Sequence, residues 1–290
     1  MHKPVLLNEV INYLNLREDL IYVDCTAGLG GHSYEILEKL NGKAKLILID
    51  QDKTALDLSK ERLKDYKNCY FFHSNFIHLR EILNTLNIKE ITGGVLLDLG
   101  VSSLQLDSIE RGFSFKNGNK LDMRMDQSQE IDAYYVINHY NKEKLAKLIY
   151  EYGEERYSRR IADFICETRS KSGPIKTAEE LSNLILKCYP KNKYFKIHPA
   201  TRTFQAIRIE VNRELESLNK FLCFIPELLS EGSRLTVISF HSLEDRITKH
   251  FLKSRKDLKI LTKKPVIASD IEIKDNNRAR SAKLRAAEKV

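Results

Sequence analysis

Glycines and a carboxylate gather in one short stretch of the chain, Asp24-Cys25-Thr26-Ala27-Gly28-Leu29-Gly30-Gly31-His32. Glycines let a backbone come close to a ligand, and a helix that starts here offers unpaired N–H groups. A dinucleotide fingerprint needs glycine at the first, third and sixth positions of its turn, but Ser33 takes the sixth position when Gly28 is counted as the first. Asp24 would repel a pyrophosphate and attract a cation. The turn therefore favours S-adenosylmethionine (SAM) over a nicotinamide cofactor, while a turn that only serves chain geometry is the alternative.

Acids also end two other apolar runs. Asp50 ends one of them about 20 residues past Gly28, the spacing at which an acid binds the two hydroxyls of a ribose. Asp98 ends another, just before Gly100. Phe76 follows a further run, where an adenine ring could lie against it, and a core aromatic is an equally good interpretation. Polar groups at the ends of parallel strands meet at one edge of a sheet, so we expect a single ligand site there.

Apolar runs of strand length alternate with helical stripes in the first and last thirds of the chain. They lie at 21–23, 44–49, 69–73, 95–99 and 235–240. This alternation predicts an α/β fold with a parallel sheet, whereas residues 132–190 carry only helical stripes and predict an inserted all-helical domain. The predicted segments are 1–104 for the first part of the α/β core, 105–205 for the insert and 206–290 for the second part.

Three element assignments follow from local patterns near the end of the chain. One apolar stripe from Phe204 to Leu222 predicts a single long helix from about residue 201 to 226. Ser242 and Asp245 match a helix N-cap and its N3 partner, which leaves His241 without a capping role and directed at the ligand site. The basic stretch 276–285 predicts either a tail or a final edge strand, and we expect the strand.

Composition narrows the class of protein. The 290 residues carry a formal net charge of +8 with a pI near 9.1, which favours a polyanionic partner such as RNA. Five scattered cysteines form no C-x-x-C pair and the histidines form no H-E-x-x-H motif, so we expect no disulfide framework and no metal. We find no signal-peptide core or membrane-length apolar run, and expect a cytoplasmic protein without membrane contact. The oligomeric state stays open, with a homodimer as one alternative.

Longer blocks of unusual residues point to one family. They are the glycine turn with His32, Leu97-Asp98-Leu99-Gly100-Val101-Ser102-Ser103, Arg111-Gly112-Phe113-Ser114-Phe115, Leu121-Asp122-Met123-Arg124-Met125, Tyr152-Gly153-Glu154-Glu155-Arg156, Thr203-Phe204-Gln205-Ala206-Ile207-Arg208-Ile209, Ser239-Phe240-His241-Ser242-Leu243-Glu244-Asp245-Arg246 and Arg280-Ser281-Ala282-Lys283-Leu284-Arg285. Together with His2-Lys3-Pro4-Val5-Leu6-Leu7 they resemble the ribosomal small-subunit RNA cytosine-N4 methyltransferases of the RsmH/MraW type. The resemblance covers essentially the whole chain and implies a Rossmann-like class I SAM-dependent methyltransferase core with an inserted helical domain.

The resemblance also implies an activity, a partner and a set of site residues. The activity is methylation of the exocyclic N4 amine of one cytidine in the decoding region of 16S rRNA, within the small ribosomal subunit. Carried over residue by residue, the family's SAM site falls on Gly30, Gly31, His32, Asp50, Phe76, Asp98 and Gln105. His32 and Gln105 come mainly from the resemblance, whereas the other five also follow from local chemistry.

Methyl transfer to an aromatic amine needs in-line alignment of the reacting atoms and an acceptor for the amine proton. We expect Ser102, Ser103 and nearby backbone carbonyls to hold the amine, with His241 or water as the proton acceptor. Alanine at Ser103 or His241 should then lower methyl transfer at least about tenfold. Unstacked bases are bound by aromatic rings and guanidinium planes. The candidate RNA contacts are therefore Arg111, Phe113, Arg124 and Arg202.

Two other functions fit parts of the pattern. A nicotinamide-dependent oxidoreductase is disfavoured because the turn lacks its sixth-position glycine. A non-catalytic RNA-binding assembly factor is disfavoured because Asp50, Asp98 and the glycine turn are all intact. Titration with NAD and with SAM distinguishes a methyltransferase from the oxidoreductase. Transfer of labelled methyl groups to small subunits distinguishes it from the assembly factor.

Overall fold

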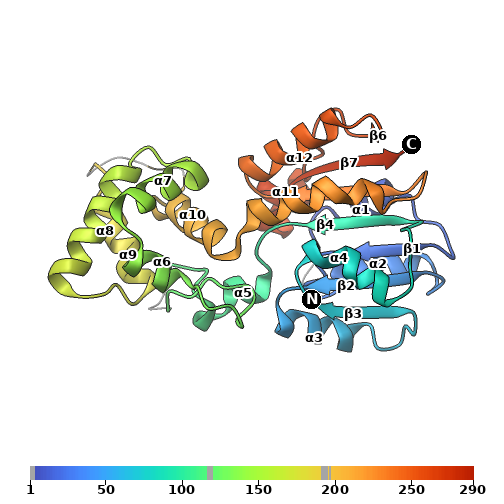
Figure 1. Cartoon of the computed structure of the whole chain (residues 1–290), viewed down its shortest axis with the longest axis horizontal. Coiled ribbons are helices and arrows are strands. Elements are labelled where there is room, and N and C mark those ends of the chain that lie inside the picture. The colour runs from blue at the N-terminus through green and yellow to red at the C-terminus, as the bar shows by residue number, and fades with distance from the viewer. Residues whose placement is uncertain (1–3, 116–119, 191–194, 196) are drawn as a thin grey trace. The chain divides into compact units, whose positions relative to one another are not determined.

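The computed structural model describes residues 4–115, 120–190, 195 and 197–290. The chain forms two compact units, one built from Met1–Gly100 and Leu215–Val290 and the other from Val101–Glu214 (Figure 1). The segment 105–205 that the sequence sets apart lies inside the second unit. Because the second unit interrupts the first, the first unit draws its strands from two distant parts of the chain.

A sheet forms the centre of the first unit, with seven strands within the described residues. They are β1 Ile21–Asp24, β2 Lys45–Asp50, β3 Cys69–His73, β4 Gly94–Asp98, β5 Arg234–Ser239, β6 Leu258–Ile260 and β7 Lys283–Lys289. Their spatial order is β3-β2-β1-β4-β5-β7-β6, and every pair from β3 to β5 is parallel (Figure 1). This is the predicted Rossmann-like α/β fold. The order reverses between β1 and β4, where sheets of this kind bind ligands outside the carboxyl ends of their strands.

Helices pack on both faces of this sheet. One face carries α1 Leu7–Leu14, α2 Gly31–Lys39 and α3 Lys53–Arg62, and the other carries α4 Leu79–Thr85, α11 Glu214–Phe224 and α12 Ser242–Ser254. Successive strand residues point to opposite faces, so Leu48 of β2 packs with the first group and Ile49 with the second. Shorter helices complete the unit: η1 Phe76–His78, η3 Ile225–Glu227, α13 Asp270–Asp275 and η4 Asn277–Ser281.

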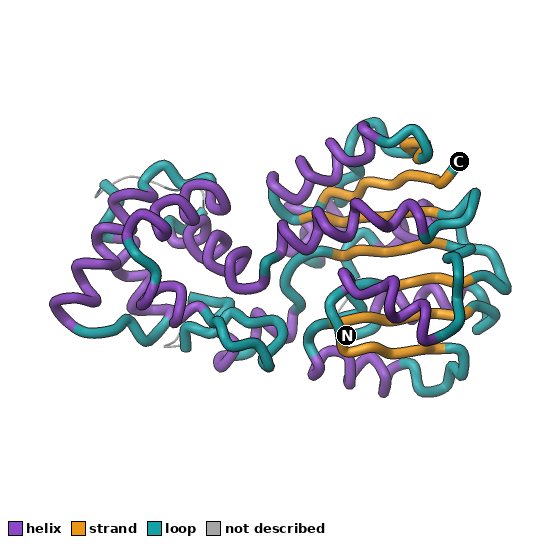
Figure 2. The backbone as a smooth tube through the Cα atoms, viewed as in Figure 1, coloured by secondary structure: helices purple, strands orange, loops and turns teal. Residues whose placement is uncertain are grey.

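Helices and loops build the described part of the second unit (Figure 2). The helices are α5 Ser103–Asp107, η2 Ile109–Arg111, α6 Ala133–His139, α7 Lys142–Gly153, α8 Ser158–Ser172, α9 Ala178–Leu186 and α10 Ala200–Asn212. Their apolar stripes meet in one core, as the helical spacing predicts. At Gly153, a Cβ atom would lie 2.7 Å from the carbonyl oxygen of Arg202, so only glycine lets α7 approach α10 this closely. No helix of either unit's described part has the length and apolar content needed to cross a membrane.

The single long helix expected from 201 to 226 is wrong. The chain breaks at Arg213, whose φ of +49° is left-handed, and α10 and α11 lie on either side of it. The apolar stripe continues through the break because it serves two cores: Phe204 of α10 packs in the second unit, and Leu218 of α11 packs in the first. Spacing alone does not distinguish one helix from two that bury the same pattern in different places.

The final strand is real, but it is not at the edge. β7 pairs antiparallel with both β5 and β6, which makes it an interior strand and leaves β6 at the edge. Its alanines are buried, while Arg285 is satisfied by an ion pair with Asp245 at 2.7 Å. The basic composition that favours an exposed edge is accommodated because this cation has a partner on α12.

Candidate active site

Side chains of the loop between β1 and α2 hold the loop closed. Asp24 is 1% exposed; its Oδ1 accepts the Thr26 N–H at 3.2 Å and its Oδ2 accepts the Ser33 hydroxyl at 2.6 Å. The Thr26 hydroxyl oxygen in turn accepts the Asp98 N–H at 2.7 Å. These bonds tie the ends of β1 and β4 together at the reversal of the sheet order.

The three glycines of this loop have different roles. Gly28 has a φ of +52°, and a Cβ there would meet only the Thr26 carbonyl oxygen, at 3.9 Å. Gly30 has a φ of +71° and would place a Cβ 3.1 Å from that of Ser59, whereas a Cβ at Gly31 would lie 2.6 Å from Cγ of Pro4. Gly30 and Gly31 therefore let α2 begin close to its neighbours, and Gly28 leaves open space that a ligand could occupy.

Asp50, at the end of β2, accepts two backbone N–H groups. Its Oδ2 accepts from Gly28 and its Oδ1 from Asp52, both at 2.7 Å. Burial raises the pKa of Asp50 to about 6 despite these hydrogen bonds. Burial likewise raises the pKa of Asp24 to about 6. A carboxyl with a lone pair to spare at this position can accept a ribose hydroxyl, as the sequence predicts for Asp50.

Asp98, at the end of β4, faces His32 of α2. The His32 Nε2 lies 2.9 Å from the Val5 carbonyl oxygen, which can only accept, so this nitrogen carries a proton. The His32 Nδ1 then faces Asp98 Oδ2 at 3.7 Å, too far for a hydrogen bond. Asp98 Oδ1 is buried and has no hydrogen-bond partner among the described residues. Burial raises the pKa of Asp98 well above its usual range, and the carboxyls of Asp24 and Glu244 add to the effect.

Three carboxyl groups thus end neighbouring strands of the first unit. In the described part of the chain, no lysine or arginine forms an ion pair with Asp24, Asp50 or Asp98. Buried carboxylates without a cation nearby are costly, and the raised pKa values express that cost. A cationic ligand placed at this edge would remove it. These residues therefore fit a positively charged methyl donor such as SAM.

Phe76 lies in η1, directly after β3. Its side chain is 7% exposed, and its ring packs edge-to-face on Phe221 with 5.3 Å between centroids. It belongs to the apolar core between the sheet and α4 and α11. The core interpretation therefore holds, and contact with an adenine ring stays a prediction for the small part of the side chain that is accessible.

Gln105, Ser102 and Ser103 belong to the second unit. The Ser102 hydroxyl oxygen accepts the Gln105 N–H at 3.3 Å, and Gln105 Oε1 accepts the Ser102 N–H at 3.0 Å. These two bonds form a capping box at the N-terminus of α5. The Ser103 side chain lies outside the described residues. Ser102 follows Asp98 by four residues, so the chain keeps their Cα atoms within roughly 14 Å of each other.

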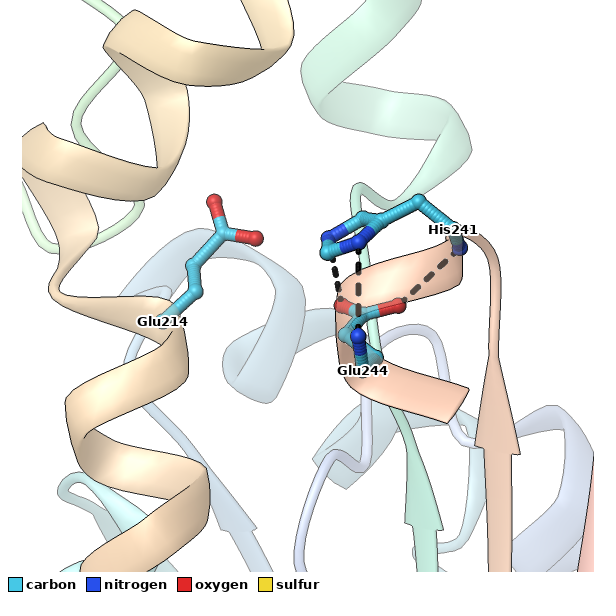
Figure 3. Close-up of side chains that lie close together, drawn as sticks. All are labelled: Glu214, His241 and Glu244. Carbon is cyan, nitrogen blue, oxygen red and sulfur yellow. Dashed lines mark hydrogen bonds and ion pairs between the residues drawn. The ribbon is translucent and has the colours of Figure 1, made fainter. Parts of the chain in front are cut away.

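His241 is the N-cap of α12, and the expected cap at Ser242 is wrong by one residue. Its Nδ1 faces the Glu244 N–H at 3.5 Å, and its Nε2 lies 3.2 Å from Glu244 Oε1 (Figure 3). Glu244 Oε2 accepts the His241 N–H at 3.3 Å, which completes a capping box, and it also accepts the Phe240 N–H at 2.8 Å. Histidine is a rare N-cap, which is why the sequence pattern suggested the serine. Glu214, also drawn in Figure 3, belongs to the second unit and pairs there with Arg208 at 2.7 Å.

Three of the four candidate RNA contacts have internal partners instead. Arg111 is 6% exposed and donates to the carbonyls of Arg124 and Met125 at 3.0 and 2.9 Å. Phe113 is 8% exposed and lies in the core of the second unit. Arg124 forms a bidentate pair with Asp122. These side chains stabilise the irregular segment that follows α5, and we do not carry Arg111 and Phe113 forward as RNA contacts.

Arg202 has a different setting. Its guanidinium donates to the Glu154 carbonyl at 3.2 Å and lines a hollow of about 360 Å³ in the second unit. Aromatic side chains surround this hollow: Tyr189, Phe195 and His198. A cation beside aromatic rings is the combination that binds unstacked bases. Arg202 is therefore the candidate RNA contact best supported by its surroundings.

The structure adds one residue that sequence reasoning missed. Glu244 is 2% exposed, holds the start of α12, and raises the pKa of Asp98 by its charge. The signal for it was present: a glutamate three residues after an N-cap is the second half of a capping box. Placing the N-cap at Ser242 instead of His241 put Asp245, and not Glu244, at the N3 position.

The chain is similar to known proteins over its whole length. A family model described as the MraW methylase family matches residues 1–290. A relative from Caldicellulosiruptor bescii, named Ribosomal RNA small subunit methyltransferase H, is 50% identical over 307 residues and covers 100% of this chain and 99% of its own. Relatives with the same name from Clostridium botulinum and Trichodesmium erythraeum are 48% and 50% identical over the same share of each chain.

Proposed function

Because this chain belongs to the MraW methylase family, we propose that it methylates the N4 amine of one cytidine in the decoding region of 16S rRNA, with SAM as the methyl donor. Its relatives are named as methyltransferases of small-subunit ribosomal RNA, which supports the class of substrate. We take the small ribosomal subunit as the partner and the cytoplasm as the place, because ribosomal subunits are assembled there.

One observation carries the choice of donor: among the described residues, the buried Asp98 Oδ1 has no hydrogen-bond partner, at an edge where three carboxyl groups pair with no lysine or arginine. SAM, when bound, supplies a methyl group on a positively charged sulfur. Asp98 and Asp24 favour a positive charge at this edge, and Asp50 accepts a hydroxyl of the ribose. Gly28 leaves the space, while Gly30 and Gly31 hold the start of α2 close to it.

The amine of the target cytidine is a weak nucleophile, so the enzyme's residues must orient it and receive its proton. We assign the orienting role to Ser102, Ser103 and the backbone carbonyls beside them. The Ser102 hydroxyl accepts one hydrogen bond from the backbone and keeps a second lone pair that can accept an N–H of the amine. Of the two proton acceptors left open by the sequence, we favour water, because the Nδ1 of His241 accepts the Glu244 N–H, which leaves the ring proton on Nε2.

The test is methyl transfer to small subunits isolated from cells that lack this protein. The purified enzyme and methyl-labelled SAM should label the subunit RNA, and mass mapping should place the label on one cytidine of the decoding region. Asp98→Asn serves as the catalytically impaired control. Absence of label, or label on a different base or on protein, would contradict the proposal.

Roles of individual residues need a second measurement. Ser103→Ala should lower the rate of methyl transfer at least about tenfold while SAM affinity, measured by calorimetry, stays within about twofold. A change in SAM affinity alone would mean that Ser103 contacts the methyl donor and not the substrate amine. Full activity would remove it from the site.

A further inference from the structure

The surface of the second unit has a hollow of about 750 Å³ beside α7 and the start of α8. Five of its lining residues carry the argument, and we call the hollow they define the α7/α8 groove: Lys142, Lys147, Tyr150, Arg156 and Arg159. Its volume lies within the roughly 300–1,000 Å³ of ordinary ligand sites. It is therefore large enough for one nucleotide with its phosphate.

The cations of this groove are only partly neutralised. Lys142 pairs with Asp163 at 2.9 Å and Lys147 approaches Glu151 at 4.0 Å. Both arginines are exposed; the Arg156 guanidinium lies 5.0 Å from the ring centroid of Tyr157, and Arg159 has no ion-pair partner among the described residues. Other arginines of the unit differ, as Arg169 donates to two carbonyls at 2.6 Å. The groove thus keeps guanidinium groups available to an anion.

Tyr150 supplies an aromatic face to the same groove. Its side chain is 64% exposed, which is high for a ring of this size, and within the described part of the chain it stacks on no other ring. Base stacking on an exposed aromatic ring tolerates every sequence, and nearby arginines hold the phosphate. An acidic peptide would pair with the arginines but would not stack on the ring of Tyr150.

We propose that the α7/α8 groove is an accessory RNA site that holds one unpaired nucleotide of ribosomal RNA, with its base on Tyr150 and its phosphate on Arg156 and Arg159. The inference rests on the proposed function, since it takes rRNA as the substrate. The groove lies entirely in the second unit and includes none of the donor-binding residues. It therefore contributes to RNA affinity and not to the chemical step.

The full-length protein tests this with a fluorescently labelled single-stranded RNA and with small subunits. Tyr150→Ala should raise the Kd for the labelled RNA and the KM for subunits about tenfold, the effect of losing one stacked base, with kcat unchanged. Tyr150→Phe keeps the ring and should stay within about twofold. Arg159→Gln should weaken binding and reduce the slope of log Kd against log salt by about 0.7, the value for one phosphate of a single strand.

Two matched controls stand outside the groove. Tyr135 on α6 is also exposed, and Lys187 after α9 is an exposed cation. Tyr135→Ala and Lys187→Gln should leave RNA affinity and its salt dependence unchanged. Thermal unfolding of every variant shows that the fold is kept, as expected for substitutions of exposed side chains.

The outcomes separate this inference from the proposed function. If the wild-type enzyme methylates rRNA but Tyr150→Ala and Arg159→Gln bind RNA like the wild type, the groove is not an RNA site. The same conclusion follows if polyglutamate loses affinity in these variants while RNA does not. If the wild-type enzyme transfers no methyl group to rRNA, the proposed function fails, whatever the variants bind.

Discussion

At the sheet edge of the first unit, Asp24 is buried and Asp50 and Asp98 are partly buried, and none of them pairs with a lysine or arginine among the described residues, whereas two arginines of the second unit bind backbone carbonyls. Arg111 and Arg169 each donate to two backbone carbonyls of their own unit. The first unit thus keeps uncompensated charge at the place where strands end. In the second unit, Arg111 and Arg169 instead stabilise an irregular segment and a helix end.

This difference shows how to distinguish functional from structural charge. A group whose burial is uncompensated raises the free energy of the apo protein, and a ligand can lower it again. A guanidinium that donates to backbone carbonyls of its own unit contributes to folding and has fewer donors left for a partner. The net charge of +8 therefore overstates how much of the surface is available to RNA.

The largest expected effect concerns the carboxyl groups at the sheet edge of the first unit. Asp98→Asn keeps the shape of the side chain and removes its charge, so methyl transfer should fall at least about a hundredfold, or roughly 2.7 kcal/mol. Stability should not fall, because the substitution removes a carboxyl whose burial raises its pKa. Single-turnover rates and thermal unfolding measure the two quantities. Asp57→Asn, on exposed α3, is the control. Full activity in Asp98→Asn would show that the charge of Asp98 has no role in methyl transfer.

The next largest effect concerns the arginines of the second unit that bind backbone carbonyls. Arg169→Ala leaves the carbonyls of Ile137 and Tyr140 without their donors and should destabilise the protein by about 2 kcal/mol. Denaturant unfolding measures this change, and calorimetry should find SAM affinity within about twofold of the wild type. Lys187→Ala provides the exposed control. A stable Arg169→Ala variant with weakened RNA binding would make this arginine functional instead of structural.

A smaller effect concerns pH. Burial raises the pKa of both Asp24 and Asp50 to about 6, so these carboxyls lose their charge as pH falls through 6. A cation prefers the ionised form, so SAM affinity should be full above pH 7 and should fall about tenfold by pH 5. S-Adenosylhomocysteine lacks the sulfonium charge, and its affinity should change less. Equal pH dependence of the two ligands would mean that the carboxyls do not act on the sulfonium.

The smallest effect separates the two interpretations of His241. His241→Ala removes the N-cap of α12 and should cost about 1 kcal/mol, whereas asparagine caps well and should cost only a few tenths. If water takes the amine proton, methyl transfer by His241→Asn stays within about threefold of the wild type. A loss of tenfold or more at unchanged stability would restore His241 as the proton acceptor.

The parts of this fold that could be predicted are those with a local cause. An apolar run closed by an acid and glycines has one common structural meaning, so the ends of β1, β2 and β4 were placed correctly. The break at Arg213 could not be predicted, because the apolar stripe runs through it unchanged. The burial of Arg111 could not be predicted for a related reason: it depends on carbonyls of the segment at Arg124 and Met125, which only tertiary structure brings within reach.

The candidate site divides in the same way. Asp50 and Asp98 follow from strand ends and glycine turns. The structure supplies what no pattern contains: within the described residues Asp98 Oδ1 has no hydrogen-bond partner, and burial raises the pKa of Asp98. The α7/α8 groove had no sequence signal beyond basic residues, because a hollow arises from two helices packing together. Tyr150 on its own looks like any other surface tyrosine.

The position of β7 inside the sheet has a consequence for synthesis on the ribosome. Residues 101–214 are contiguous and can fold as soon as they leave the exit tunnel, whereas β5 and β6 wait for residues 283–289 to complete their pairing. The helical unit is therefore expected to be finished while the donor-binding sheet is still open at β5. A nascent chain would hold a folded helical unit well before the candidate donor site is complete.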